Sequence, residues 1–197
     1  MKYLLLCCCC FICVNLHAQV KPIYFKGDQL TSDQSIATSY AIYGKLSSEE
    51  LWVIKRYDLM DNLMLTGTYQ DSLLAVPHGD FVFYMDVAAF NEQNGTAFTI
   101  KNKTRFNFQK GSFVNGLEQG RWILFFPDGN ILNIQHYVDG KLHGEFKTFD
   151  RFGNELISGH YKNGELDGEW LLNKGTKKNT YENGVFKSSV AVKKPKK

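Results

Sequence analysis

Short runs rich in Phe, Tyr, Trp, Ile and Leu alternate with turn dipeptides over most of the chain. The runs are seven to ten residues long, which is too short and too often interrupted by glycine for helices, and their aromatic and β-branched content favours strands. Asn-Gly and Asp-Gly pairs adopt the positive φ angles of two-residue hairpin turns at little cost. The pattern therefore predicts an all-β fold of antiparallel hairpins, with tight turns at Asn115-Gly116, Asp139-Gly140, Asn163-Gly164 and Asn183-Gly184.

Four kinds of position recur at a step of 24 residues, and such a period is the mark of a repeat architecture. The first aromatic column holds Phe113, Tyr137 and Tyr161, and the second holds Trp122, Phe146 and Trp170. Two glycine columns lie between them, at Gly116, Gly140 and Gly164 and at Gly120, Gly144 and Gly168. Because the second glycine stands two residues before a large ring, we expect an aromatic side chain to lie flat over it.

The repeat extends upstream in a weaker form. Residues 57–69 align without a gap on residues 149–161, and residues 78–81 copy residues 143–146. About ten extra residues separate Asn94-Gly95 from Phe113, and we interpret them as a lengthened hairpin or loop. The chain then divides as follows: 1–18 a signal peptide, 19–51 an N-terminal leader or cap, 52–186 an array of about five hairpin units, and 187–197 a Lys-rich flexible tail.

The Gly-x-x-x-Gly-x-Trp column followed by Tyr-x-Asn-Gly, clearest from Gly111 to Gly184, resembles the MORN repeat in its bacterial 24-residue form. The resemblance covers about residues 52–186. It implies an elongated, twisted sheet of stacked hairpins that acts as a scaffold or interaction surface, with no established chemistry. Some bacterial proteins of this type carry an antitoxin label. The ten-residue insertion and Lys177, which replaces a turn glycine in the final unit, depart from the pattern.

The first eighteen residues have the layout of a secretory signal. Lys2 precedes an apolar run over Leu4–Val14, and the small residue Ala18 marks the expected cleavage position. We expect a mature chain that begins near Gln19 and is exported to the periplasm, the outer envelope or the medium. A tethered form, through an uncleaved anchor, is the alternative; neither Cys7 nor Cys13 has the surroundings that a lipid-modified cysteine needs. Cleavage would remove all five cysteines, and with them any disulfide or thiolate chemistry: Cys7, Cys8, Cys9, Cys10 and Cys13.

Charge is distributed unevenly along the chain. The formal net charge is +3, but residues 19–186 hold 17 basic and 20 acidic side chains, and the excess of lysine lies in the last eleven residues. A nucleic-acid-binding protein usually carries a basic face on the fold itself, so we expect no nucleic-acid partner. No apolar run after the signal has the 18–20 residues that a membrane span needs, so no transmembrane span is expected in the mature chain.

The periodic polar residues do not form a catalytic or metal-binding pattern. Equivalent residues of adjacent hairpins lie about 10 Å apart, too far for a shared metal ion at bonds of about 2 Å. This applies to His136 with His160 and to His78 with His143. The column of Asp80, Glu145 and Glu169 repeats a single environment, whereas paired catalytic carboxylates need two different ones. We therefore predict no enzyme activity, no metal site and no cofactor.

The two aromatic columns are the candidate functional residues. Their rings are expected to stack as the core of the array, since a single sheet has little else to bury. Part of this ribbon could instead stay exposed as a binding platform, because exposed aromatic patches usually mean a partner. We predict a non-enzymatic interaction or scaffold module that binds a protein or an envelope component. An antitoxin-like neutraliser and, further off, a carbohydrate-active envelope enzyme are the alternatives.

Overall fold

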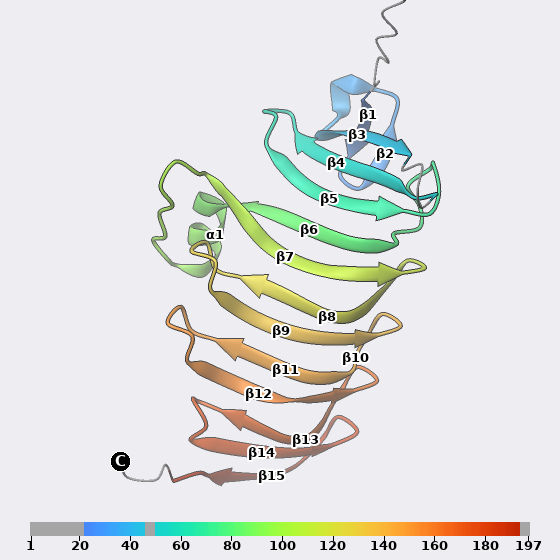
Figure 1. Cartoon of the computed structure of the whole chain (residues 1–197). Coiled ribbons are helices and arrows are strands. Elements are labelled where there is room, and N and C mark those ends of the chain that lie inside the picture. The colour runs from blue at the N-terminus through green and yellow to red at the C-terminus, as the bar shows by residue number, and fades with distance from the viewer. Residues whose placement is uncertain (1–21, 46–49, 194–197) are drawn as a thin grey trace, which may run out of the picture.

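The strands form one open antiparallel sheet, seen in a computed structural model that describes residues 22–45 and 50–193 (Figure 1). The sheet has 15 strands, and β15 and β2 are its two edges. From β3 to β9 and again from β11 to β15, neighbours in the chain are also neighbours in the sheet, and β9 pairs directly with β11. The predicted all-β fold of stacked hairpins is confirmed.

The strand bounds follow the turn dipeptides. The N-terminal strands are β1 (Ile23–Lys26), β2 (Gln29–Thr31), β3 (Ser39–Lys45), β4 (Trp52–Asp58), β5 (Leu63–Tyr69) and β6 (Gly79–Asp86). The middle strands are β7 (Arg105–Val114), β8 (Leu117–Phe125), β9 (Ile131–Val138) and the two-residue β10 (Lys141–Leu142). The C-terminal strands are β11 (Gly144–Phe149), β12 (Glu155–Lys162), β13 (Glu165–Leu172), β14 (Lys177–Glu182) and β15 (Val185–Ala191). A short 3-10 helix, η1 (Gln34–Ile36), links β2 to β3.

The four predicted hairpin turns are confirmed by their backbone angles. Asn115 and Gly116 have φ angles of 52° and 84°, and Asn163 and Gly164 have 52° and 90°. Both central residues of a type I′ turn need positive φ, which asparagine tolerates and glycine adopts freely. The same holds at Asp139-Gly140 and Asn183-Gly184. Three of these turns, at Asn115-Gly116, Asp139-Gly140 and Asn163-Gly164, are 24 residues apart and therefore set the length of each hairpin unit.

The expected ring-over-glycine contact exists, but not at the repeated glycine. Nothing lies within 4 Å of a Cβ built on Gly120 or Gly168, and both have positive φ angles, of 70° and 72°. The covered glycines are Gly67, Gly111 and Gly159, each on the strand before its ring, where a Cβ would overlap the rings of Phe81, Trp122 and Trp170 respectively. The prediction named the wrong glycine because it considered the glycine two residues before the ring on the same strand. The ring instead covers a glycine on the preceding strand, which lies beside it in the sheet.

The extra residues before Phe113 were predicted to be a lengthened hairpin or loop, and the helix α1 (Val87–Asn94) directly before them was not predicted. Together, α1 and the connection that leads to β7 form an insertion, residues 87–104, between β6 and β7. Asp86 caps α1 and accepts hydrogen bonds from the amides of Ala88 and Ala89. Gly95 ends the helix in a left-handed conformation, with φ at 60°, so Asn94-Gly95 is a helix terminus rather than a strand turn. Buried apolar side chains pack between this insertion and the sheet: Val87, Phe90, Phe98, Phe106 and Phe126.

The two ends of the array also extend the sheet. β3 pairs with β4, β1 with β3 and β2 with β1, so the predicted leader continues the sheet. Phe25, Ala41 and Ile54 form a second buried cluster there. Strand β15 runs to Ala191, so residues 187–191 belong to the sheet and the flexible tail was placed too early. The predicted signal peptide lies outside the described residues. No helix in the described part of the chain is long and apolar enough to cross a bilayer.

Candidate functional site

The predicted aromatic columns form a ladder of rings across one face of the sheet. Phe113 of β7 contacts Trp122 of β8 at a centroid distance of 5.0 Å, and Trp122 contacts Tyr137 of β9 at 6.1 Å. Tyr161 of β12 lies 5.4 Å from Phe146 and 5.0 Å from Trp170. Most of these pairs meet edge to face, the arrangement that aromatic quadrupoles favour. The six predicted residues thus form two contact groups, and Phe81 of β6 and Tyr69 of β5 extend the first.

Within the ladder, the rings differ in how far solvent reaches them. Trp122 and Trp170 are buried, with 2% and 5% of their surfaces exposed. The other four predicted residues are only half-buried: Phe113, Tyr137, Phe146 and Tyr161. Burial raises the pKa of both Tyr137 and Tyr161. The tryptophans therefore act as the packed centre of each group, and the flanking rings present their outer edges to solvent.

The opposite face carries a row in which a lysine occurs at every third strand, with two aliphatic or hydroxyl side chains between successive lysines. Residues paired across antiparallel strands share a face, and successive residues of a strand alternate. Each of Trp122, Phe146 and Trp170 is followed by a member of this row. The register gives the row from β4 to β15 as Lys55, Thr66, Val82, Lys110, Ile123, Ile134, Lys147, Ser158, Leu171, Lys178 and Val190.

Beside this row, two acids of the column that holds Asp80, Glu145 and Glu169 form ion pairs with lysines. Glu145 contacts Lys147 at 2.5 Å, and Glu169 contacts Lys178 at 2.6 Å. The hydrogen bond from Lys147 is the main reason that the pKa of Glu145 is lowered, and the nearby His136 and His160 add to the effect. Among the described residues, no three His, Cys, Asp or Glu side chains gather closely enough to hold a metal ion. Glu145 and Glu169 thus each have a local ionic partner, and Asp80 accepts a hydrogen bond from the Ser112 hydroxyl at 2.5 Å.

A cleft of about 640 Å³ lies where the insertion meets β6, β7 and the turn between β8 and β9. Such a volume is typical of small-molecule sites. Ile100, Phe106 and Phe126 link the cleft to the buried cluster of the insertion. Its charged and aromatic lining comes from Tyr84, Lys103, Arg105, Lys110, Phe125 and Asp128.

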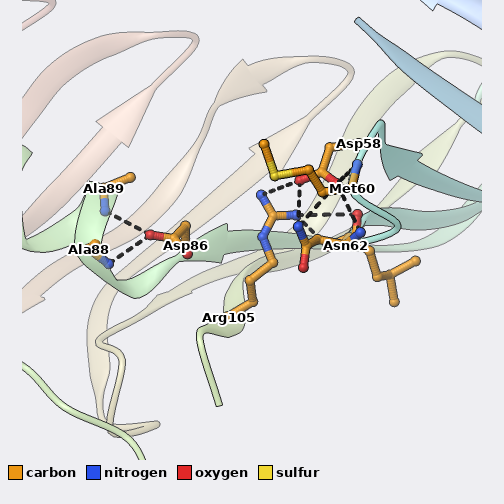
Figure 2. A network of polar contacts seen from close by, with 8 residues as sticks. Asp58, Met60, Asn62, Asp86, Ala88, Ala89 and Arg105 are labelled. Atoms are coloured by element: carbon orange, nitrogen blue, oxygen red, sulfur yellow. Dashed lines mark hydrogen bonds and ion pairs between the residues drawn. The ribbon is translucent and has the colours of Figure 1, made fainter.

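Arg105 is held at the rim of this cleft by the turn between β4 and β5 (Figure 2). Its guanidinium donates to the carbonyl of Leu63 at 2.9 Å and lies 3.8 Å from the carboxylate of Asp58. Burial raises the pKa of Asp58, but hydrogen bonds from Asn62 and Met60 and the charge of Arg105 outweigh it, and the net pKa is lowered. Asp58 therefore stays ionised and fixes both the turn and the arginine.

Sequence reasoning did not find the cleft. Its residues come from β6, the insertion, β7 and the end of β8, and only the interruption of the 24-residue period marked this region as different. Periodicity identifies residue types that repeat, whereas Lys103 lies in a segment with no counterpart elsewhere in the array, and the positions equivalent to Lys110 at steps of 24 residues hold Ile134 and Ser158. The signal that could have found them is the cluster of basic and aromatic residues over 101–110, KNKTRFNFQK.

Comparisons with known proteins give no relative that carries a function. No protein-family model matches the chain, and no curated protein matches it. Among solved structures, the chain is similar to S. aureus TarM, crystallised as a mutant with fondaparinux, alpha-GlcNAc-glycerol and UDP. The match has a TM-score of 0.35 and 12% identity, and it covers 68% of this chain. It spans only 21% of the TarM chain, and at this TM-score it carries no argument about fold or function.

Proposed function

We propose that the protein is an exported, non-enzymatic interaction module of MORN-like hairpin repeats, which binds a protein partner of the cell envelope along its aromatic face. The observation that carries the proposal is the ring ladder. Half-buried rings at Phe113, Tyr137, Phe146 and Tyr161 lie on one face of an open sheet, and three of them recur at the 24-residue step.

The packing within the ladder supports a recognition role for these rings. Trp122 and Trp170 hold their neighbours in fixed edge-to-face contacts, so a partner would meet rings that are already ordered. Ordered aromatic side chains contribute strongly to interfaces because little conformational entropy is lost when they bind, and tyrosine and tryptophan are enriched among the residues that dominate binding energy. The spacing of two strands per unit, about 10 Å, suits an extended partner surface.

The test is site-specific photo-crosslinking in envelope extract. A photoreactive side chain placed at Tyr137 lies on the ring ladder. The same group placed at Val138, which is 44% exposed, lies on the other face of the same strand and is the matched control. We expect one discrete crosslinked protein from the Tyr137 position and none from the Val138 position.

Two results would contradict this proposal. Crosslinking from Val138 that equals or exceeds crosslinking from Tyr137 would move recognition to the opposite face. A turnover activity that one polar substitution abolishes, with folding unchanged, would replace the interaction module with an enzyme.

A further inference from the structure

We propose that the cleft formed by the insertion binds an organic anion, namely a carboxylate or phosphate group attached to a planar aromatic body. This site is separate from the ring ladder and does not depend on the proposed protein partner. Tyr84 and Lys110 reach it from the sheet face opposite Phe81, since Lys110 pairs with Val82 and Tyr84 follows Val82 by two residues.

The charge of the lining favours an anion. Three cationic side chains, Lys103, Arg105 and Lys110, line the cleft with one carboxylate, Asp128. Arg105 also lies 3.8 Å from the carboxylate of Asp58, so the excess positive charge comes from the two lysines. Within residues 22–45 and 50–193, neither Lys103 nor Lys110 has a carboxylate oxygen within 4.0 Å. In the row across the sheet, by contrast, Lys147 and Lys178 each have a glutamate partner. The positive charges of Lys103 and Lys110 are therefore not compensated by a nearby carboxylate of the described chain, and a bound anion could pair with them.

The aromatic lining favours a planar body. The Lys110 ammonium lies 5.4 Å from the centroid of the Phe125 ring, so charge and ring surface stand next to each other. Tyr84 and Phe125 are half-buried and leave ring surface for stacking. A ligand with an anionic head beside a flat apolar body would contact both kinds of group at once.

The position of the cleft is fixed by the surrounding structure. Arg105 is tied to Asp58 and to the carbonyl of Leu63, and Asp86, which pairs with Arg105 across the sheet, caps α1. The rim is thus anchored on one side by the turn between β4 and β5 and on the other by the helix. A preformed rim lowers the entropic cost of binding.

The experiment titrates the mature chain with phenylacetate and with phenyl phosphate, and with 2-phenylacetamide as the neutral control, by ligand-observed NMR and calorimetry. We expect at least one anion to bind at millimolar concentration or tighter and the amide to bind at least about tenfold more weakly, because the lysine charges have no partner in the neutral probe. Tighter binding of phenyl phosphate would assign a phosphate head, and equal or tighter binding of phenylacetate a carboxylate.

The matched variants are Lys103→Gln with Lys110→Gln, and Lys101→Gln as control. Lys101 is an exposed lysine of the same loop that does not line the cleft. The double variant should weaken anion binding at least about tenfold, and the control should change it less than about twofold. The proposal is overturned if neither anion binds, if the amide binds as well as the anions, or if the double variant binds like the wild type while both variants melt as cooperatively as the parent.

Discussion

The insertion around α1 and the C-terminal repeats solve the problem of burying apolar surface in different ways. Where the 24-residue period is broken, a helix covers the sheet and Phe90 is 1% exposed inside a cluster of phenylalanines. Where the period is kept, no helix is present among the described residues from 105 to 193, and Trp170 is buried by leaning over Gly159 and against Phe146 and Tyr161. A second layer creates a core and a cleft, whereas the repeat creates a ladder of rings.

The largest effect is expected from removing the centre of the insertion cluster. Phe90→Ala should lower the free energy of unfolding by about 3–5 kcal/mol, because a fully buried ring leaves a cavity behind. Urea unfolding followed by circular dichroism measures the change. Phe152→Ala, at a ring that is 79% exposed, is the control and should change stability by less than about 0.5 kcal/mol. Equal effects would mean that the insertion has no packed core.

The packing of the C-terminal repeats is tested by Trp170→Ala. The ring is buried mainly by its neighbours in a single layer, so we expect a loss of about 3 kcal/mol, at the lower end of the range for a large aromatic residue. A melting temperature within a degree of the wild type would show that the Trp170 ring is exposed in solution. The aromatic rings would then form an exposed binding surface and not a packed core.

A glycine substitution tests the contact beneath that ring. In Gly159→Ala, the added Cβ would overlap the Trp170 ring, so the ring must shift, at a cost of about 1–3 kcal/mol. Gly44→Ala is the matched control, because Gly44 is also in a strand, has no positive φ angle, and has nothing within 4 Å of the built Cβ. Equal stabilities of the two variants would contradict the ring-over-glycine packing.

The smallest effect concerns the turn between β11 and β12. The hydrogen bond from the Asn154 side chain, assisted by Lys174 and by backbone amides, holds the pKa of Asp150 well below its usual range despite partial burial. A lowered pKa means that the stabilisation is present above the unfolded value of 3.8 and is lost as the pH falls through the folded value. Asp150→Asn should therefore melt below the wild type at neutral pH, and the gap should narrow on acidification below about pH 4. If the difference in melting temperature between the wild type and Asp150→Asn stays constant with pH, the ionised carboxylate of Asp150 does not stabilise the turn.

The sequence predicted the regular part of the molecule well because its signals are local. An Asn-Gly pair needs only its own backbone angles to form a turn, and the 24-residue step then predicts the strands between the turns. The ring-over-glycine contact was assigned to the wrong glycine, since the partner lies on the adjacent strand and its distance along the chain depends on register. The extent of β15 was missed for a similar reason: pairing with β14 extends it through Lys187 to Ala191, although the local composition resembles a tail.

The cleft and α1 could not be derived from periodicity, since both lie in the segment that interrupts it. Asp86, shortly before Ala88 and Ala89, is a helix-start signal that the sequence analysis did not use, since the turn dipeptides on either side favoured strands. Arg105 is held at the cleft by contacts with a turn more than forty residues away in the chain, and no sequence pattern gives such a contact.

The most direct test of the proposed function removes one whole unit, residues 137–160, and measures binding to the crosslinked partner by surface plasmon resonance. The deletion joins His136 to Tyr161, which occupies the position of Tyr137 in the repeat, and shortens the ladder by about 10 Å, or two strand spacings. Circular dichroism should show a folded sheet, and the affinity should fall by more than about tenfold, because several aromatic contacts are lost together. Single substitutions at His143, Glu145 or Glu169 should leave binding nearly unchanged. If the deletion leaves the affinity within about twofold of the wild type, or if one of these substitutions alone eliminates binding while folding is unchanged, the repeated aromatic face is not the interaction surface.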